Sequence, residues 1–590
     1  MNLKYFHTDI SRHIWETKYR FHNGDVIHDQ TIEDTWWRIA KSLANAENNE
    51  RKYWAQKFFD ELKGFRFIPG GRIQAGAGTG HQVTLLNCFV MGTIQDSMES
   101  IFDSLKEGAL TMQQGGGVGY DFSTLRPHGS LAKATGTIAS GPISFMRIWD
   151  SMCATLLSTG ARRGAMMATL RCDHPDIEEF ISAKQDSNEL RNFNLSVLVT
   201  DEFINAIQND EDWQLVFPIS NADDKGQHQT VMRQWSGEVR PTTCRIFKTI
   251  NARDLWDKIM HATYEYAEPG VLFIDRINDQ NNLWYKEKIS ATNPCGEIPL
   301  PAYGACDLGA INLTHFVKHP YTEDSYIDLN GIKETTTVAT RMLDNVIDVS
   351  KFPLPQQKQQ ALNCRRIGLG FTGLADALIM LGLDYGKQSS RDTAVDIMKT
   401  ICYTAYYTSI NLAEEKEVFP SFKRDEYLAG GFIRSLPKDI KSKIKKHGIR
   451  NSHLITIAPT GTTSILANNI SSGIEPVFDF SFSRKVLELD GNYKNYQLKD
   501  YAYSLWETMK NKDASLPHQF VTAKMLSPKE HLKMQAALQP YVDNAISKTI
   551  NVPEDFPYEE FQSLYMLAFK NNLKGCTTYR PNLITGSVLS

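Results

Sequence analysis

The chain has 590 residues and a mass of 66.8 kDa, which is enough for several domains or for one large enzymatic core. With 42% hydrophobic and 22% charged residues, 38 Gly and 23 Pro, its composition excludes disordered, collagenous and fibrous classes. The 64 Lys and Arg nearly balance the 68 Asp and Glu, and a net charge of −4 argues against a protein that coats nucleic acid or an anionic membrane.

The cellular compartment is predicted from what the sequence does not contain. It has no uninterrupted apolar run of about 18 residues, and Lys4, His7 and Asp9 interrupt the region where a signal peptide would be apolar. We therefore expect a cytoplasmic protein with no membrane partner. Nine cysteines are too few for a disulfide scaffold, so any disulfide should be catalytic. No CxxC, HExxH, Walker or EF-hand motif is present, and no metal site is predicted.

The N-terminal part, residues 1–64, has aromatic residues at helical spacing and is predicted to be a small helical region, with Thr31 and Asp34 at a helix start. From Phe65 onward, short apolar runs alternate with long amphipathic stretches, which favours an α/β fold with parallel strands in one catalytic unit, 65–590. The expected strands include residues 85–91, 195–200, 271–274 and 454–457.

Two helices are predicted along this region. The first has an apolar face from Met98 to Met112 and ends at three glycines from Gly115. Asp96, with Glu99 three residues later, has the spacing of a capping box at its start. The second is long, from Ala394 to Glu417.

A glycine cluster at 368–373 fits the GxGxxG pattern of dinucleotide-binding enzymes. The pattern must follow a buried strand, whereas polar residues 363–366 precede this one. We therefore favour tight packing of glycines over a nicotinamide site.

The segment Asn293-Pro294-Cys295-Gly296-Glu297 places an amide, a thiol and a carboxylate at alternating positions. In an extended chain these side chains would project to the same side and form a compact catalytic group. Taken alone, a single Cys is more often a small buried hydrophobic residue than a nucleophile.

Four blocks of sequence together resemble the catalytic subunit of ribonucleotide reductases, specifically the adenosylcobalamin-dependent class II form. They occur in the order of that family and span most of the chain. The blocks are 87–90 with 96–101 (NCFV, DSMESI), 114–122 (QGGGVGYDF), 293–313, and 458–464 with 473–476 (APTGTTS, GIEP).

The resemblance implies a ten-stranded α/β barrel with a central finger loop that carries Cys295, the residue that becomes a thiyl radical. It implies that Glu297 acts as general base on the 3′-hydroxyl and that Asn293 binds the ribose hydroxyls. Cys88 would protonate the departing 2′-hydroxyl, and Cys88 with Cys306 would supply two electrons and end as a disulfide. The enzyme would thus reduce ribonucleotides, expected as diphosphates, to 2′-deoxyribonucleotides.

The ligand sites follow from the same blocks. The substrate is expected to contact Asn87, Gly117 and, through its phosphates, Pro459, Thr460, Gly461, Thr462 and Thr463. The last five could also be an ordinary Thr-rich helix cap. A deoxynucleoside triphosphate effector is expected at Asp96, Ser97, Met98, Arg126 and Lys133, beside the loops 126–141 and 184–192, and at a homodimer interface; for the two basic residues the alternative is solvated surface.

Class II is favoured by the Pro-Cys-Gly-Glu form of the finger loop, by the lack of an ATP cone, and by the lack of a tandem-tyrosine relay near Tyr579. The alternatives are a class I catalytic subunit with a separate metal-radical subunit and a catalytically inactive nucleotide sensor. No C-terminal cysteine pair follows Cys576, so we expect reduction by dithiothreitol or another thiol, and poor access for a thioredoxin-like protein acting alone.

Overall fold

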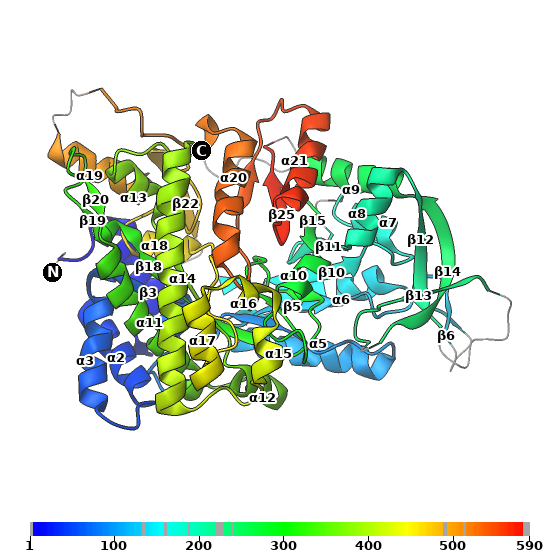
Figure 1. Cartoon of the computed structure of the whole chain (residues 1–590), viewed down its shortest axis with the longest axis horizontal. Coiled ribbons are helices and arrows are strands. Elements are labelled where there is room, and N and C mark those ends of the chain that lie inside the picture. The colour runs from blue at the N-terminus through cyan, green and yellow to red at the C-terminus, as the bar shows by residue number, and fades with distance from the viewer. Residues whose placement is uncertain are drawn as a thin grey trace. The chain divides into compact units, whose positions relative to one another are not determined.

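The computed structural model describes residues 4–132, 137–158, 162–163, 165–186, 189–219, 228–238, 240–487, 493–510 and 515–581. Within these residues the chain divides into two compact units of mixed α/β structure, and many of their elements are labelled in Figure 1. The first unit comprises the described parts of Met1–Asn87 and Ala305–Asn551, and the second those of Cys88–Gly304 and Val552–Gly586.

The N-terminal helical region of the first unit forms as predicted. Its main helices are α2 (Ile32–Ala44) and α3 (Arg51–Leu62), which pack against each other. Thr31 and Asp34 form a capping box at the start of α2, which satisfies two backbone N–H groups. One face of α2, including Trp36, is buried. Two shorter helices flank this pair, α1 (Asp9–Ile14) and α4 (Gly71–Gly76).

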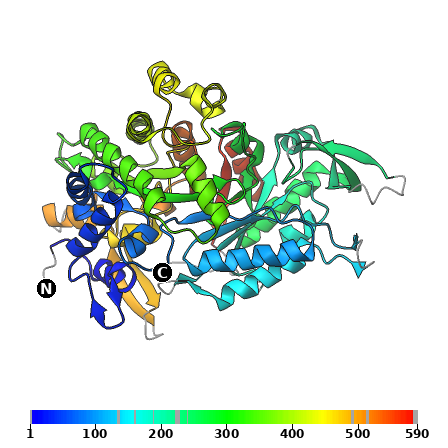
Figure 2. The ribbon, with the colours of Figure 1, turned by 90° about the horizontal axis from the view of Figure 1, so that it is seen from below.

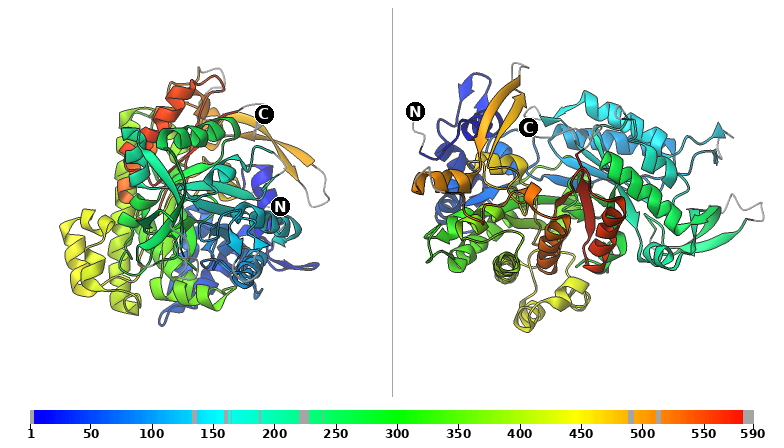
Figure 3. Two further views of the ribbon diagram at one scale, coloured as in Figure 1. Left: turned by 90° about the vertical axis from the view of Figure 1, so that its right-hand side faces the viewer. Right: turned by 90° about the horizontal axis from the view of Figure 1, so that it is seen from above.

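The central strand of the first unit is β18 (Ala305–Asn312), which runs parallel to β21 (Ile367–Thr372) and antiparallel to β3 (Phe67–Pro69). Every residue of β18 and β21 is buried. The long helix α14 (Gln388–Lys416), predicted over 394–417, packs against α11 (Leu329–Val349). The other elements are α12 (Pro355–Cys364), α13 (Leu374–Met380), α15 (Arg424–Leu428), α16 (Gly431–Ser435), α17 (Lys438–His447), α18 (Gly461–Leu466), α19 (Tyr501–Met509), α20 (Pro528–Leu538), β1 (His22–Asn23), β2 (Val26–Ile27), β19 (Val317–Lys318), β20 (Tyr326–Ile327), β24 (Thr549–Asn551) and the ribbon of β22 (Ser481–Leu487) and β23 (Tyr493–Lys499), seen in Figure 3.

The GxGxxG pattern lies inside the buried strand β21 itself, with Gly373 leading into α13. A Cβ on Gly370 would lie 2.1 Å from the carbonyl oxygen of Thr456, so this glycine allows two backbones to approach. That geometry agrees with the packing interpretation. The strand expected at 454–457 is wrong as a continuous ladder, because the Asp543 carboxylate accepts the N–H groups of Leu454 and Ile455 and only isolated bridges form.

The second unit is built on a sheet with the strand order β4-β5-β10-β11-β15-β25, parallel except for the last strand. Three of these strands correspond to the runs expected at 85–91, 195–200 and 271–274. The strands are β4 (Cys88–Val90), β5 (Gly117–Asp121), β10 (Met166–Arg171), β11 (Phe193–Val199), β15 (Gly270–Phe273) and β25 (Gly575–Tyr579). The helices are α5 (Met98–Gln113), α6 (Pro142–Thr155), α7 (Ile177–Ser182), α8 (Asp201–Asn209), α9 (Ala252–Tyr266), α10 (Ile274–Asp279) and α21 (Tyr558–Lys570).

A separate antiparallel sheet in this unit has the order β12-β14-β13, and the smaller strand pairs are β6–β7 and β8–β9. Their bounds are β12 (Asp212–Pro218), β13 (Thr230–Arg233), β14 (Thr242–Asn251), β6 (Leu131–Ala132), β7 (Thr137–Ile138), β8 (Leu157–Ser158) and β9 (Arg162–Arg163). The core of the unit contains a cluster of aromatic rings between strands and α6, formed by Tyr120, Phe122, Trp149 and Phe193.

Helix α5 differs from the prediction at its start. Ser97, and not Asp96, caps the helix by accepting the Ser100 N–H, because the Asp96 carboxylate is bonded to Arg126. The predicted apolar face is only partly buried: Ile101 and Met112 are buried, whereas Met98 and Phe102 are exposed. Helices α5 and α6 lie side by side, as Figure 2 shows in light blue and cyan.

Candidate functional site

The candidate active site is a hairpin in the second unit, between the antiparallel strands β16 (Ala291–Thr292) and β17 (Pro299–Leu300). Its turn is closed by the Gly296 N–H donating to the Asn293 carbonyl at 3.0 Å. Gly296 has φ +82°, a left-handed conformation that residues with a Cβ rarely adopt. The predicted extended path through 293–297 is therefore wrong: the segment is a tight turn.

The turn brings three of the predicted catalytic side chains together. The Asn293 Nδ2 donates to the sulfur of Cys88 at 3.2 Å, and the Cys88 thiol lies 3.9 Å from Glu297 Oε1. The Asn293 side chain also accepts the Ile298 N–H at 3.0 Å, which fixes its orientation. Cys88, Asn293 and Glu297 are each at most 4% exposed. A thiol, an amide and a carboxyl group therefore form one buried polar cluster.

Burial raises the pKa of Glu297 to about 7, since a charged carboxylate loses its hydration there. The Asn293 amide opposes this effect because it stabilises the carboxylate form. At neutral pH both forms of the Glu297 carboxyl group are populated, which suits a group that takes up and returns a proton.

Cys295 differs from its neighbours because it is exposed at the tip of the turn, whereas the other eight cysteines are buried. Asn293 and Glu297, on either side of it in the turn, are buried. The one exposed thiol among the nine cysteines thus lies two residues from Asn293 and two residues from Glu297 of the buried cluster.

Glycines of the neighbouring strands set the position of the hairpin. Gly117 is paired in register with Cys88 on the adjacent strand. A Cβ on Gly119 would lie only 1.9 Å from the carbonyl oxygen of Thr292, so the hairpin base rests directly on the β5 backbone. The glycine run at 115–119 therefore has a packing role that includes close approach to the hairpin.

Several predicted site residues belong to the first unit. Cys306 is buried in β18, where its thiol lies 3.2 Å from the Asp307 carbonyl oxygen. Asn87 is close to it, since the Asn87 N–H donates to the Cys306 carbonyl at 3.2 Å. The described contacts therefore join Cys306 to Asn87.

The predicted phosphate-binding segment, residues 459–463, is also in the first unit and runs into α18. Thr460 has φ +51°, and its hydroxyl group is 2.9 Å from that of Thr372 and accepts the Gly473 N–H at 2.9 Å. Pro459, Thr460, Thr462 and Thr463 are half-buried and Gly461 is exposed. The simple Thr-rich cap does not form, because no side chain caps α18.

The predicted effector residues lie at the start of α5. Arg126 forms an ion pair with Asp96 at 2.7 Å, and the Arg126 N–H also donates to that carboxylate at 3.2 Å. Both side chains are about a quarter exposed. Ser97 caps α5, and Met98 is 58% exposed. Lys133 lies outside the described residues.

Sequence reasoning missed three side chains that contact these segments. Asn194 donates to the Pro294 carbonyl beside Cys295, Thr372 contacts Thr460, and Tyr303 donates to Glu107 of α5. Asn194 stands in a mostly apolar strand that also contains Ser196, so its polarity alone does not single it out. Thr372 and Tyr303 are common residue types without a local pattern.

The described residues contain no group of three or more His, Cys, Asp or Glu side chains that could hold a metal ion. None of their helices is both long and apolar enough to cross a bilayer.

Comparison with protein families agrees with the motifs. Residues 86–579 match the model described as ribonucleotide reductase, barrel domain, and residues 5–82 match the ribonucleotide reductase all-alpha domain. The chain therefore belongs to the ribonucleotide reductase family, and the predicted resemblance is confirmed.

Named relatives add detail within the family. The chain is 36% identical to the vitamin B12-dependent ribonucleoside-diphosphate reductase of Mycobacterium tuberculosis strain CDC 1551, over 97% of this chain and 79% of that protein. It is 37% identical to the Thermoplasma acidophilum protein of the same name, over 96% and 70%. A ribonucleoside-diphosphate reductase subunit alpha of Chlamydia pneumoniae is 26% identical over 96% and 58%.

Proposed function

We propose that this chain is a class II ribonucleotide reductase that converts ribonucleoside diphosphates to 2′-deoxyribonucleoside diphosphates. The observation that carries the proposal is the buried cluster of Cys88, Asn293 and Glu297 beside the exposed Cys295. Relatives that share 36–37% identity over nearly the whole chain are named as vitamin B12-dependent diphosphate reductases. For the fold, we propose a ten-stranded barrel around the hairpin. The description of the matched family model as a barrel domain supports this proposal.

The residues divide the chemistry among themselves. A thiyl radical at Cys295 removes the 3′-hydrogen atom of the ribose, and Glu297 takes the proton of the 3′-hydroxyl group. The Asn293 amide binds a ribose hydroxyl, and Cys88 protonates the 2′-hydroxyl group, which leaves as water. Cys88 and Cys306 together supply two electrons and one further proton, and they become a disulfide. Glu297 returns the proton to the 3′-oxygen, and Cys295 returns hydrogen to C3′, so that both the base and the radical are regenerated.

The cofactor implied by the relatives is adenosylcobalamin, which supplies the initiating radical when bound. The residues present fit this requirement at one point: the Cys295 sulfur is at an exposed turn, and every other cysteine is buried. Cys295 and the half-buried Gly296 form the part of the hairpin that such a group must approach. Glu297 and Asn293 remain on the buried side, where they hold the proton and the substrate hydroxyl.

Substrate and effector are proposed to bind at different segments. Asn87, Gly117 and residues 459–463 bind the nucleotide, the last through backbone N–H groups and threonine hydroxyls that suit phosphate oxygens. Asp96, Ser97, Met98, Arg126 and Lys133 bind a deoxynucleoside triphosphate, whose phosphates compete with Asp96 for the Arg126 guanidinium.

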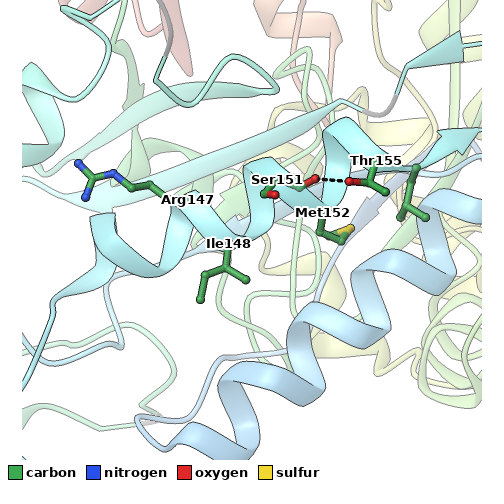
Figure 4. A pocket seen from close by; sticks show the side chains of 6 residues that line it. Arg147, Ile148, Ser151, Met152 and Thr155 are labelled. Carbon is green, nitrogen blue, oxygen red and sulfur yellow. Dashed lines mark hydrogen bonds between the residues drawn. The ribbon is translucent and has the colours of Figure 1, made fainter.

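A homodimer is proposed through α5 and α6, whose exposed surfaces carry apolar side chains. Met98, Phe102 and Leu110 on α5 are 58%, 47% and 39% exposed, and Ile148 on α6 is 37% exposed. Ile148 and Met152 line a hollow of about 550 Å³ along α6, shown in Figure 4. Exposed apolar side chains gathered on adjacent helices indicate an interface, and a second copy can cover them.

The deciding experiment measures deoxynucleotide formation with adenosylcobalamin, dithiothreitol and a ribonucleoside diphosphate. The wild-type chain should turn over repeatedly, and Cys295→Ser should bind nucleotide without forming product, because an O–H bond is too strong to replace the thiol. Multiple turnover by Cys295→Ser would contradict the radical assignment. Turnover that requires a metal-radical subunit and no cobalamin would contradict class II. Effector binding without turnover under either condition would indicate a nucleotide sensor.

A further inference from the structure

The backbone that leads to Cys295 is held on the sheet of the second unit through alternate carbonyl groups. The Ser290 carbonyl accepts a hydrogen bond from the Thr169 hydroxyl at 2.8 Å. Two residues later, the Thr292 carbonyl lies over Gly119. Two residues later again, the Pro294 carbonyl accepts from the Asn194 side-chain amide at 2.7 Å. The spacing of two is that of an extended chain whose alternate carbonyls face one surface.

The sheet register explains why these contacts occur together. Met167 pairs with Gly119 on one side and with Asn194 on the other, so the three residues form one row across β5, β10 and β11. Residues in register on parallel strands project to the same face of a sheet. The positions of Gly119 and Asn194 under the hairpin are therefore fixed by strand pairing.

We propose that Asn194 is a positioning residue for the reaction, which fixes the peptide group before Cys295 and thereby the location of its sulfur. The inference rests on the proposed role of Cys295. Of the three described contacts, the one from Asn194 is the nearest to Cys295, because its partner Pro294 lies in the turn and is bonded directly to Cys295. Its amide comes from a paired strand, so the donor is held by the sheet. Without it, the nearest of the other two contacts is at Thr292, three residues before Cys295.

The test compares four forms of the full chain: wild type, Asn194→Ala, Thr169→Val and Asn209→Ala. Thr169→Val also changes a buried side chain, and it removes the hydrogen bond to the Ser290 carbonyl, five residues before Cys295. Asn209→Ala is the matched control, since its amide donates at the surface to Glu211 and is remote from the hairpin in sequence. Asn194→Asp is the same size as wild type without the amide donor, and replaces Asn194→Ala if that variant fails to fold.

Two readouts are measured. The first is kcat and KM, where loss of positioning should lower kcat by about 10- to 100-fold and change KM by less than about threefold. The second is the rate at which iodoacetamide alkylates Cys295 in the protein without added cofactor, followed by mass spectrometry of its peptide. This rate should change by about three- to tenfold, as expected when one neutral hydrogen bond is lost. Asn209→Ala should alter kcat by less than about threefold, and Thr169→Val should lower it less than Asn194→Ala does.

The outcomes separate the inference from the proposed function. The inference is overturned if Asn194→Ala matches wild type in both kcat and alkylation rate. It is also overturned if Thr169→Val lowers kcat as much as Asn194→Ala, because a contact five residues before Cys295 would then matter as much as the one at Pro294. If Cys295→Ser remains active, the proposed role of Cys295 fails instead, whatever Asn194 does.

Discussion

Adding one methyl group at Gly119 should inactivate the enzyme without unfolding it. The Cβ of Gly119→Ala would lie 1.9 Å from the Thr292 carbonyl oxygen, and ordinary contact begins at 3.4 Å. Relieving the clash therefore requires a displacement of about 1.5 Å. Thr292 immediately precedes Asn293, so the displacement moves the turn that carries Asn293, Cys295 and Glu297.

A misplacement of about 1 Å can lower the rate of an enzyme about 100-fold, and we expect at least this loss in kcat for Gly119→Ala. KM should change by less than about threefold, because the proposed phosphate contacts are in the first unit. Overpacking of this kind destabilises a protein by about 1 to 3 kcal/mol, so the melting temperature should fall modestly.

The control is Gly270→Ala, in strand β15 of the same sheet. A Cβ there would meet the Ser196 hydroxyl at 3.2 Å, and a hydroxyl group can rotate away. The assay is steady-state kinetics combined with thermal unfolding of both variants. If Gly119→Ala keeps kcat within about threefold of wild type while losing as much stability as Gly270→Ala, close approach at Gly119 does not position the turn.

Four further predictions concern Glu297, Arg126 and Phe102. Because the pKa of Glu297 is raised to about 7 and the carboxylate is the proposed base, kcat/KM should fall about tenfold per pH unit below 7, and Glu297→Gln should lose at least about 100-fold and this pH dependence. The protonated Glu297 stabilises the fold below its unfolded pKa, and this contribution is lost as pH rises towards 7, so Glu297→Gln should gain melting temperature relative to wild type between pH 5 and 8; no gain would contradict the raised pKa. Arg126→Ala should weaken effector triphosphate binding about tenfold in titration calorimetry with basal turnover intact, and unchanged affinity would remove Arg126 from that site. Phe102→Asp should shift the mass measured by light scattering towards a monomer, and a persistent dimer would contradict the α5 interface.

The sequence predicted correctly those strands and helices that depend mainly on residues close together in the chain. The apolar runs at β4, β11 and β15 form because each can be buried between neighbours, and Thr31 caps α2 because its partner Asp34 is three residues away. The strand expected at 454–457 failed because the Asp543 carboxylate, about 90 residues later, takes the N–H groups that a neighbouring strand would otherwise accept. Such a competitor cannot be recognised from spacing.

The same distinction applies to the site. The motif identified the residue types at 293–297, but alternation implied an extended segment, whereas Gly296 at φ +82° allows a turn. The sequence predicted that Asn293, Cys295 and Glu297 share one side of an extended segment. In the structure Asn293 and Glu297 are buried, whereas Cys295 is exposed at the tip of a turn. Asn194 was missed because its role depends on strand register across three strands, and a single sequence contains no direct signal of register.

Gly119 and Gly370 have no side chain at points where two main chains approach each other, and this affects how the protein tolerates substitutions elsewhere. In each unit, a strand glycine contacts a carbonyl just before a functional segment: Thr292 before the turn with Cys295, and Thr456 before residues 459–463. A contact between two main chains has no rotamer to switch, so its spacing depends less on how the side chains around it repack. The surrounding helices can therefore accumulate substitutions while the height of each segment above its strand stays constant. Attempts to engineer substrate preference should accordingly vary side chains at the rims of these segments and leave both glycines unchanged.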